Sequence, residues 1–245
     1  TYTALMNEAD ESPEGLVKAK QMLEKLESFD VFHPWCEVEK ARYLLRTDEK
    51  ERAESVAREV LGKYGKDDKV LLTGAGILLS CGYPEEAEHI YDGYLEREKG
   101  KRSNFGNYTA LLGLGKIHMK REDWEKAREL LVDARDYQVT EELEKLLEET
   151  NQALTEKYLA KADSLTEEEA KNLCLCFSSL NRAEEGWEFF EKHPEYEWNT
   201  LDWHRAMTFL AANAGQFQIA IDRAGLWRGF VEAEISEENQ KAAEN

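Results

Sequence analysis

Apolar and polar residues follow one another along this chain with the period of an α-helix. Ala, Leu, Glu and Lys recur at i, i+3 and i+4 spacing through nearly every stretch, which is typical of amphipathic helices. The strict apolar and polar alternation of strands is nowhere sustained, and the sequence holds only four prolines. The pattern therefore predicts an all-α fold.

Short blocks of similar pattern recur along the chain. In each block a turn residue precedes a small residue, and an apolar residue follows the small one four positions later. The small residues lie 34, 34, 40, 59 and 34 positions apart and are Ala19, Ala53, Ala87, Ala127, Gly186 and Ala220. A small residue lets two helices approach closely, so we expect all six positions to be buried within helix pairs.

One block carries a longer motif. Its pattern residues are Leu111, Leu114, Gly115, His118, Trp124, Ala127, Leu131 and Ala134. With the 34-residue spacing, they make the chain similar to the tetratricopeptide-repeat (TPR) superfamily. The resemblance covers nearly the whole chain and implies an α-solenoid of stacked antiparallel helix pairs. The chain departs from the pattern where His118 replaces the usual aromatic residue and Gly186 replaces the packing alanine.

Two of the spacings exceed 34 residues and indicate insertions. The first, within residues 99–106, predicts a long basic loop between two helix pairs. The second, from Thr140 to Asp163, predicts one long helix that interrupts the array. The expected organisation is an N-terminal arm over residues 1–138, the inserted helix over 139–163, a C-terminal arm over 164–231 and an acidic tail over 232–245.

Cap residues mark several expected helix starts. Residues 166–169 and 181–184 each place Thr or Asn three positions before Glu, the form of a capping box. Pro13 and Pro84 are expected in the first turns of second helices, where a missing N–H costs nothing.

The balance of charge restricts the classes of partner. With 51 acidic and 32 basic residues the chain has a formal charge of −19, which argues against direct binding of nucleic acid. No run approaches the roughly 18 uncharged apolar residues that would cross a bilayer. The four cysteines are too few and too irregularly spaced for a disulfide scaffold, which favours a cytoplasmic location.

The sequence contains no convincing catalytic, cofactor or metal motif. The glycines at 74 and 76 resemble a dinucleotide turn, but Leu79 stands where the third glycine would be. The five histidines include no i, i+4 pair and no nearby cysteine at ligand spacing. Acidic residues are spread so widely that no pair of carboxylates can be singled out as a catalytic acid and base. The sequence therefore predicts a protein that is not an enzyme and uses no cofactor or metal.

The TPR resemblance implies that the first helix of each pair lines a concave groove. Transferring the family's groove positions gives 25 residues, of which seven are basic and two acidic. The expected peptide-binding residues of the N-terminal arm are Arg42, Arg46, Lys69, Leu72, Lys116, Met119 and Lys120. Gly76 leaves room for a ligand backbone, but it stands where a two-carboxylate clamp would need Asn, so no such clamp is expected.

The expected function is a protein-interaction scaffold or adaptor whose groove binds an acidic or amphipathic protein segment. One alternative is the ligand-sensing repeat domain of a bacterial peptide-responsive transcriptional regulator, and another is an accessory repeat arm of a larger enzyme. The acidic run from Glu141 to Glu149 offers a docking surface for a basic partner, or a solvated helix face. The sequence leaves the partner and the oligomeric state open.

Overall fold

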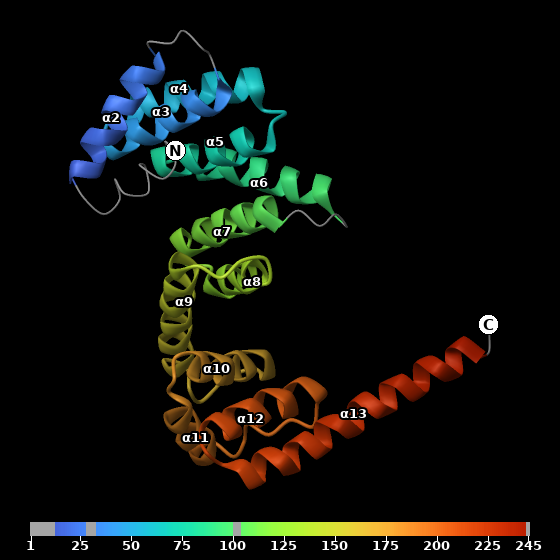
Figure 1. Cartoon of the computed structure of the whole chain (residues 1–245). Coiled ribbons are helices and arrows are strands. Elements are labelled where there is room, and N and C mark those ends of the chain that lie inside the picture. Colours follow the sequence, from blue (N-terminus) through green and yellow to red (C-terminus); the bar gives the residue numbers. More distant parts are fainter. Residues whose placement is uncertain (1–12, 28–32, 100–103, 244–245) are drawn as a thin grey trace. The chain divides into compact units, whose positions relative to one another are not determined.

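The computed structural model describes residues 13–27, 33–99 and 104–243, and within these ranges all the regular structure is helical (Figure 1). The all-α expectation is confirmed. The chain divides into two compact units, unit 1 (Thr1–Leu143) and unit 2 (Glu144–Asn245). Within the described residues no helix is both long and apolar enough to cross a membrane. The core of the predicted basic loop, residues 100–103, lies outside the described ranges.

Unit 1 is built from antiparallel helix pairs that stack in chain order (Figure 1). The pairs are α3 (Pro34–Arg46) with α4 (Lys50–Tyr64), α5 (Asp68–Cys81) with α6 (Pro84–Glu98), and α7 (Asn104–Lys120) with α8 (Trp124–Arg135). The helix α2 (Pro13–Glu27) packs against α3. First helices also contact first helices, α3 with α5 and α5 with α7. This is the stacked α-solenoid that the repeat spacing predicts.

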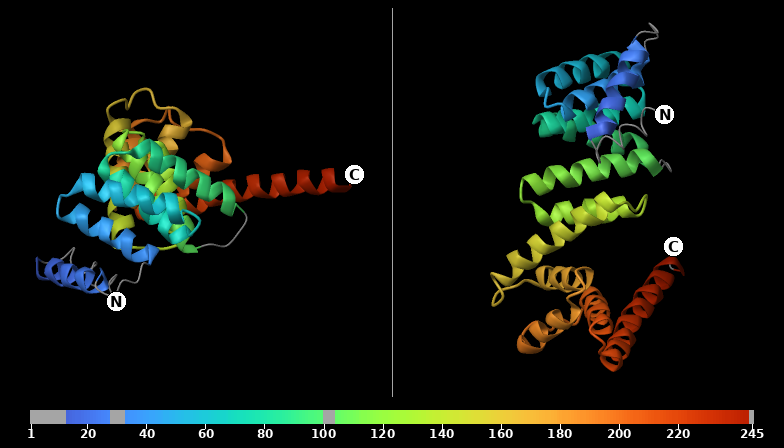
Figure 2. Two further views of the ribbon diagram at one scale, coloured as in Figure 1. Left: turned by 90° about the horizontal axis from the view of Figure 1, so that it is seen from above. Right: turned by 60° about the vertical axis from the view of Figure 1, so that its left-hand side comes forward.

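The division between the units falls within α9 (Glu141–Leu159), a single helix of 19 residues inside the expected insertion. Unit 2 continues with α10 (Glu167–Ser179), α11 (Ala183–Lys192), α12 (Leu201–Asn213) and α13 (Phe217–Ala243). In both views of Figure 2 the second half of α13, in red, extends past α12. Residues 232–243, expected as a polar tail, are the continuation of α13.

The turn inside each helix pair contains one residue with a positive φ. These residues are Asp48, Gly82, Glu122, Asn181 and Gly215. Each stands five positions before the small packing residue of its repeat, so the turns repeat with the same spacings. The next residue donates its N–H back to the first helix, for example Tyr83 N to Leu78 O at 3.0 Å and Arg182 N to Phe177 O at 2.8 Å. A left-handed residue followed by this long return bond is the Schellman ending of a helix.

The six small residues of the repeat are all buried. Ala19, Ala53, Ala87 and Ala127 have no exposed surface, Ala220 is 7% exposed and Gly186 is also buried. The predicted repeat register is therefore confirmed. Glycine replaces alanine at 186 because a Cβ there would lie 2.7 Å from Cγ and Cδ2 of Phe177, which fills the space from α10.

Of the two predicted capping boxes, the structure contains one. Thr166 and Glu169 form the expected capping box at the start of α10. The second prediction is wrong, because α11 is preceded by Arg182 at the N-cap and Asn181 has a φ of 55°. Asparagine tolerates the left-handed conformation, so Asn181 ends α10 instead of starting α11. Pro13 and Pro84 begin α2 and α6 as expected.

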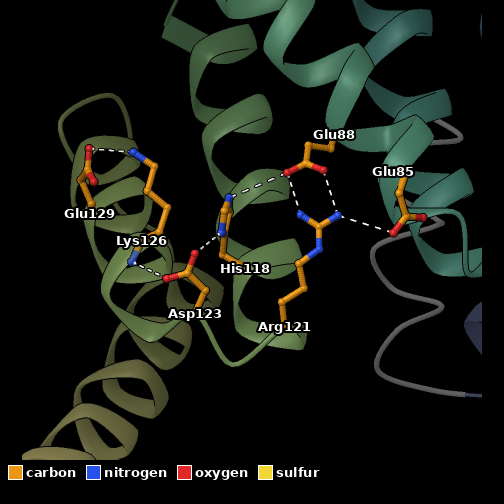
Figure 3. A network of polar contacts seen from close by, with 7 residues as sticks. All are labelled: Glu85, Glu88, His118, Arg121, Asp123, Lys126 and Glu129. Atoms are coloured by element: carbon orange, nitrogen blue, oxygen red, sulfur yellow. Dashed lines mark hydrogen bonds and ion pairs between the residues drawn. The ribbon is translucent and has the colours of Figure 1, made fainter.

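His118 takes part in a polar network between α6, α7 and α8 (Figure 3). Its Nδ1 lies 2.9 Å from Oδ2 of Asp123 and its Nε2 lies 3.9 Å from Oε1 of Glu88. Arg121 donates to both carboxylate oxygens of Glu88, at 2.7 and 2.8 Å. These hydrogen bonds hold the pKa of Glu88 below its usual value. Polar contacts therefore link three successive helices at the position where the repeat pattern has an aromatic residue.

Candidate functional site

The first helices α3, α5 and α7 line a groove of about 500 Å³ in unit 1. Helical spacing places the lining residues on one face of each helix, as with Thr109, Leu112 and Lys116 on α7. A second hollow of about 340 Å³ shares Lys69, Leu72 and Phe105 with the groove. The groove therefore lies where the repeat resemblance implies a concave face, along the first helix of successive pairs.

The groove carries positive charge in an acidic protein. Its lining includes Arg42, Lys69 and Lys116 and no carboxylate. Lys69 is exposed, and its Nζ lies 3.8 Å from the centroid of the Trp35 ring. This is the distance of a cation–π contact. In the described part of the chain no carboxylate lies within ion-pair distance of Lys69, so its charge faces the groove without an internal counter-ion.

The charge of Arg42 is neutralised by a carboxylate on its own helix, α3. Its Nη1 donates to both oxygens of Glu39, at 3.0 and 3.1 Å. The Glu39 side chain is fully buried, whereas 27% of the Arg42 side chain is exposed. A buried carboxylate needs this partner, so Arg42 is fixed at the groove wall by the ion pair.

The charge of Lys116 is neutralised by a carboxylate that is not part of the groove lining. Its Nζ donates to Oε1 of Glu142 on α9 at 2.5 Å. The Glu142 side chain is 58% exposed and that of Lys116 is 34% exposed. An ion pair this open to water is weak, of order 0–1 kcal/mol. A carboxylate arriving in the groove is therefore able to replace Glu142.

Apolar side chains make the floor and one rim of the groove. Leu72 is 1% exposed and forms floor shared by both hollows. Phe105, in the first turn of α7, is 58% exposed at the same place. An exposed aromatic ring beside buried leucine is the arrangement in which an apolar anchor of a ligand loses contact with water.

Tyr91 is the lining residue that comes from a second helix, α6. It passes between α5 and α7, where both helices have a glycine. A Cβ at Gly113 would lie 2.3 Å from Cε2 of Tyr91, and a Cβ at Gly76 would lie 3.4 Å from its hydroxyl. The two glycines therefore make the space that brings the Tyr91 phenol to the groove floor.

The structure brings four of the seven expected site residues to the groove. Arg42, Lys69, Leu72 and Lys116 line it. The other three are not among the lining residues. Arg46 is half-buried in the last turn of α3, Met119 is 9% exposed, and Lys120 is exposed at the end of α7.

Five lining residues were not among the groove positions expected from the sequence, namely Thr73, Ile77, Tyr91, Phe105 and Gly113. Phe105 stands four positions before the groove residue Thr109, so helical spacing could have placed it on the same face. Tyr91 follows the packing residue Ala87 by four positions, and the glycines at 76 and 113 were the available sign that its ring reaches the groove.

Metal chemistry finds no support in the described ranges, because no group of three or more His, Cys, Asp or Glu side chains there is placed to hold an ion. The four cysteines, which are Cys36, Cys81, Cys174 and Cys176, are all free thiols.

Stacked helix pairs with a repeat of 34 residues, with first helices lining a groove, define a fold of the tetratricopeptide-repeat class. No protein-family model and no curated protein matches the sequence. Among solved structures, a monomeric mutant of IFIT1 with Gppp-AAAA is similar, with 16% identity, a TM-score of 0.51, and coverage of 88% of this chain and 46% of IFIT1. The chain thus spans about half the length of IFIT1.

A tetratricopeptide repeat protein from Parabacteroides merdae aligns over 100% of this chain and 99% of its own, with 15% identity and a TM-score of 0.39. At 16% identity, the likeness to the IFIT1 structure concerns the fold alone.

Proposed function

We propose that this chain is a non-catalytic interaction scaffold, an adaptor, whose unit 1 groove binds a protein segment carrying carboxylates and apolar side chains. A repeat array of this class is in general a scaffold for protein interactions. The observation that carries the finer proposal is the lining itself: three cations and no carboxylate, in a chain of formal charge −19. Such a local reversal of charge selects an acidic partner.

The shape and chemistry of the groove favour a peptide as the occupant. Lys69 and Lys116 reach the groove from neighbouring first helices, and Leu72 and Phe105 line the same groove. Cations beside apolar side chains suit an extended or helical segment, which places carboxylates and apolar anchors along one line. The free cysteines accord with a reducing compartment, so we place the scaffold in the cytoplasm.

The test begins with a selection of random 12-residue peptides on the purified chain, followed by anisotropy titration of the tightest binder. The proposal predicts enrichment of Asp and Glu together with Leu or Phe. Binding should weaken as salt rises, because exposed charges are screened beyond about 8–10 Å at physiological ionic strength. Residual affinity at high salt should come from the apolar anchors.

The decisive variant is Lys69→Glu/Lys116→Glu, for which we expect at least a tenfold loss of affinity. Lys63→Glu/Lys126→Glu is the matched control, since it changes the net charge equally at two lysines paired elsewhere, with Glu59 and Glu129. The control should bind within twofold of the wild type. Selection of basic peptides, or equal losses for both variants, would contradict the proposal.

A third arm tests RNA, because the similar IFIT1 structure contains Gppp-AAAA. The same oligonucleotide should not bind this chain, whose bulk charge repels phosphate. Binding of the oligonucleotide that depends on Lys69 and Lys116 would replace the peptide proposal with an RNA-binding one.

A further inference from the structure

The Tyr91 side chain is buried, but its hydroxyl has no partner in the protein. The residue is 2% exposed, and its ring packs against Gly113. In the described part of the chain, no group forms a hydrogen bond with Tyr91 Oη. Other tyrosines of the chain are bonded, for example Tyr83 to Glu54 at 2.7 Å and Tyr108 to Thr140 at 2.6 Å.

Among the described residues the hydroxyl is not one of the fully buried polar atoms that lack a partner, so its oxygen is the part of the side chain that reaches solvent. Here the hydroxyl belongs to a residue that lines the groove, and it points to Gly76, where no side chain covers it. Burial also raises the pKa of Tyr91, so the phenol keeps its proton and is available as a donor. Its position at the groove floor makes the hydroxyl available to an acceptor on the ligand.

We propose that the Tyr91 hydroxyl, reached over Gly76, is the floor of a subsite that holds a carboxylate of the bound segment. This inference rests on the proposed function and names the group that the groove recognises. The carboxylate accepts a hydrogen bond from Tyr91 Oη. Gly76 is essential because any side chain at this position would stand between the ligand and the phenol.

Lys116 supplies the charge of the subsite. It follows Gly113 by three positions on α7, so it lies on the same face of the helix, one turn further along. In the free protein its Nζ is bonded to the exposed carboxylate of Glu142, at 2.5 Å. A ligand carboxylate at the Tyr91 hydroxyl replaces Glu142 as the partner of Lys116. The same carboxylate then accepts one hydrogen bond from the neutral phenol and one from the ammonium group.

Two variants test the subsite without threatening the fold. Tyr91→Phe removes only the unpartnered hydroxyl and keeps the ring against Gly113. Gly76→Ala adds a methyl group over the hydroxyl, in a helix where alanine is favoured over glycine. Each variant should fold at least as well as the wild type and bind the selected acidic peptide about tenfold more weakly, which corresponds to about 1.4 kcal/mol.

The matched controls are Tyr137→Phe and Gly93→Ala. Tyr137 is partly exposed and lies outside the groove, and a Cβ at Gly93 would meet nothing within 4 Å. Both should bind like the wild type. A second readout is the [ζ-13C]tyrosine resonance that disappears in Tyr91→Phe, which should shift when the peptide is added.

Peptide variants identify the source of the carboxylate. Replacement of one Glu or Asp by its amide should weaken binding to the wild type tenfold but leave binding to Tyr91→Phe almost unchanged. If amidation of the C-terminus has this effect instead, the subsite holds a terminal carboxylate.

The two proposals fail in different ways. If Tyr91→Phe and Gly76→Ala bind as tightly as the wild type while Lys69→Glu/Lys116→Glu does not bind, the subsite is refuted and the groove stands. If Lys69→Glu/Lys116→Glu binds like the wild type, the groove and the subsite are both refuted.

Discussion

Three helical glycines of unit 1 give a graded test of the packing around Tyr91. A Cβ added at Gly113 would lie 2.3 and 2.4 Å from two ring atoms of Tyr91. At Gly76 the nearest atom, the Tyr91 hydroxyl oxygen, would be 3.4 Å away, and at Gly93 no atom would lie within 4 Å. All three positions are helical, so the intrinsic gain of alanine over glycine is similar in each.

The expected stabilities follow from these distances. Gly93→Ala should stabilise the protein by about 0.5–1 kcal/mol, the usual difference between the two residues inside a helix. Gly113→Ala overlaps the Tyr91 ring by more than an ångström relative to ordinary contact at about 3.5–4.0 Å. Because Tyr91 is buried and its ring has little room to move, we expect a net loss of about 1–3 kcal/mol. Gly76→Ala should be at least as stable as the wild type.

The measurement is urea unfolding followed by circular dichroism at 222 nm, with free energies compared at a common slope. Tyr91→Leu provides the internal control. In that background the methyl group at 113 no longer meets a ring, so Gly113→Ala should lose most of its cost, and the two substitutions should be strongly non-additive. Equal stability of Gly113→Ala and Gly93→Ala would show that the Tyr91 ring does not lie between the helices as described.

Three further expectations concern the packing, the polar network and the thiols. Ala87→Leu should lower the unfolding free energy by about 1–3 kcal/mol through overpacking, and an unchanged melting curve would contradict the repeat register. Arg121→Met should cost about 0.5–1 kcal/mol at pH 7, and this cost should vanish on acidification from about pH 5 to 3. The lowered pKa of Glu88 means that its contribution is present above the unfolded-state value and is lost as pH falls through the folded one, so a cost that persists at pH 3 contradicts it. Cys174 and Cys176 are buried, and burial raises the pKa of Cys174 well above its usual value, so a thiol reagent at pH 8 should modify neither until urea unfolds unit 2.

Much of the fold was predictable because close packing leaves a strong sign in the sequence. A position between paired helices accepts only a small side chain, so Ala53, Ala87 and Ala127 reveal the repeat directly. The sequence shows that glycine replaces alanine at position 186. It does not show the cause, because Phe177, which fills the space of a Cβ there, belongs to another helix. Asn181 was misread because asparagine is favoured both at N-caps and in the left-handed conformation that ends a helix.

The site was predictable only in part. The groove positions that the TPR resemblance implies include Arg42, Lys69 and Lys116, which do line the groove. Tyr91 escapes this reasoning because it belongs to a second helix and reaches the groove only through a gap that two glycines leave. The carboxylate paired with Lys116 belongs to Glu142, 26 positions away, and helical spacing cannot predict a contact between residues so far apart in the sequence.

We propose that the two arms joined by the inserted helix differ in function, with unit 1 as the binding arm. The single helix α9 lies within the expected insertion, and the groove described above belongs wholly to unit 1. If unit 1 is the binding arm, reversal of charge in unit 2, for example Arg205→Glu on α12, should leave peptide affinity unchanged. A large loss of affinity in that variant would assign the second unit a share of the binding surface.

The central claim is that the cations of the groove recognise carboxylates of a bound segment, and complementary charge reversal tests it most directly. Anisotropy titrations would compare the wild type and Lys69→Glu/Lys116→Glu with the selected acidic peptide and with a peptide whose acidic residues are replaced by lysine. The account predicts that each protein binds the peptide of opposite charge at least tenfold more tightly than the other peptide. If the reversed protein still prefers the acidic peptide, the carboxylates are recognised elsewhere and the groove is not the binding site.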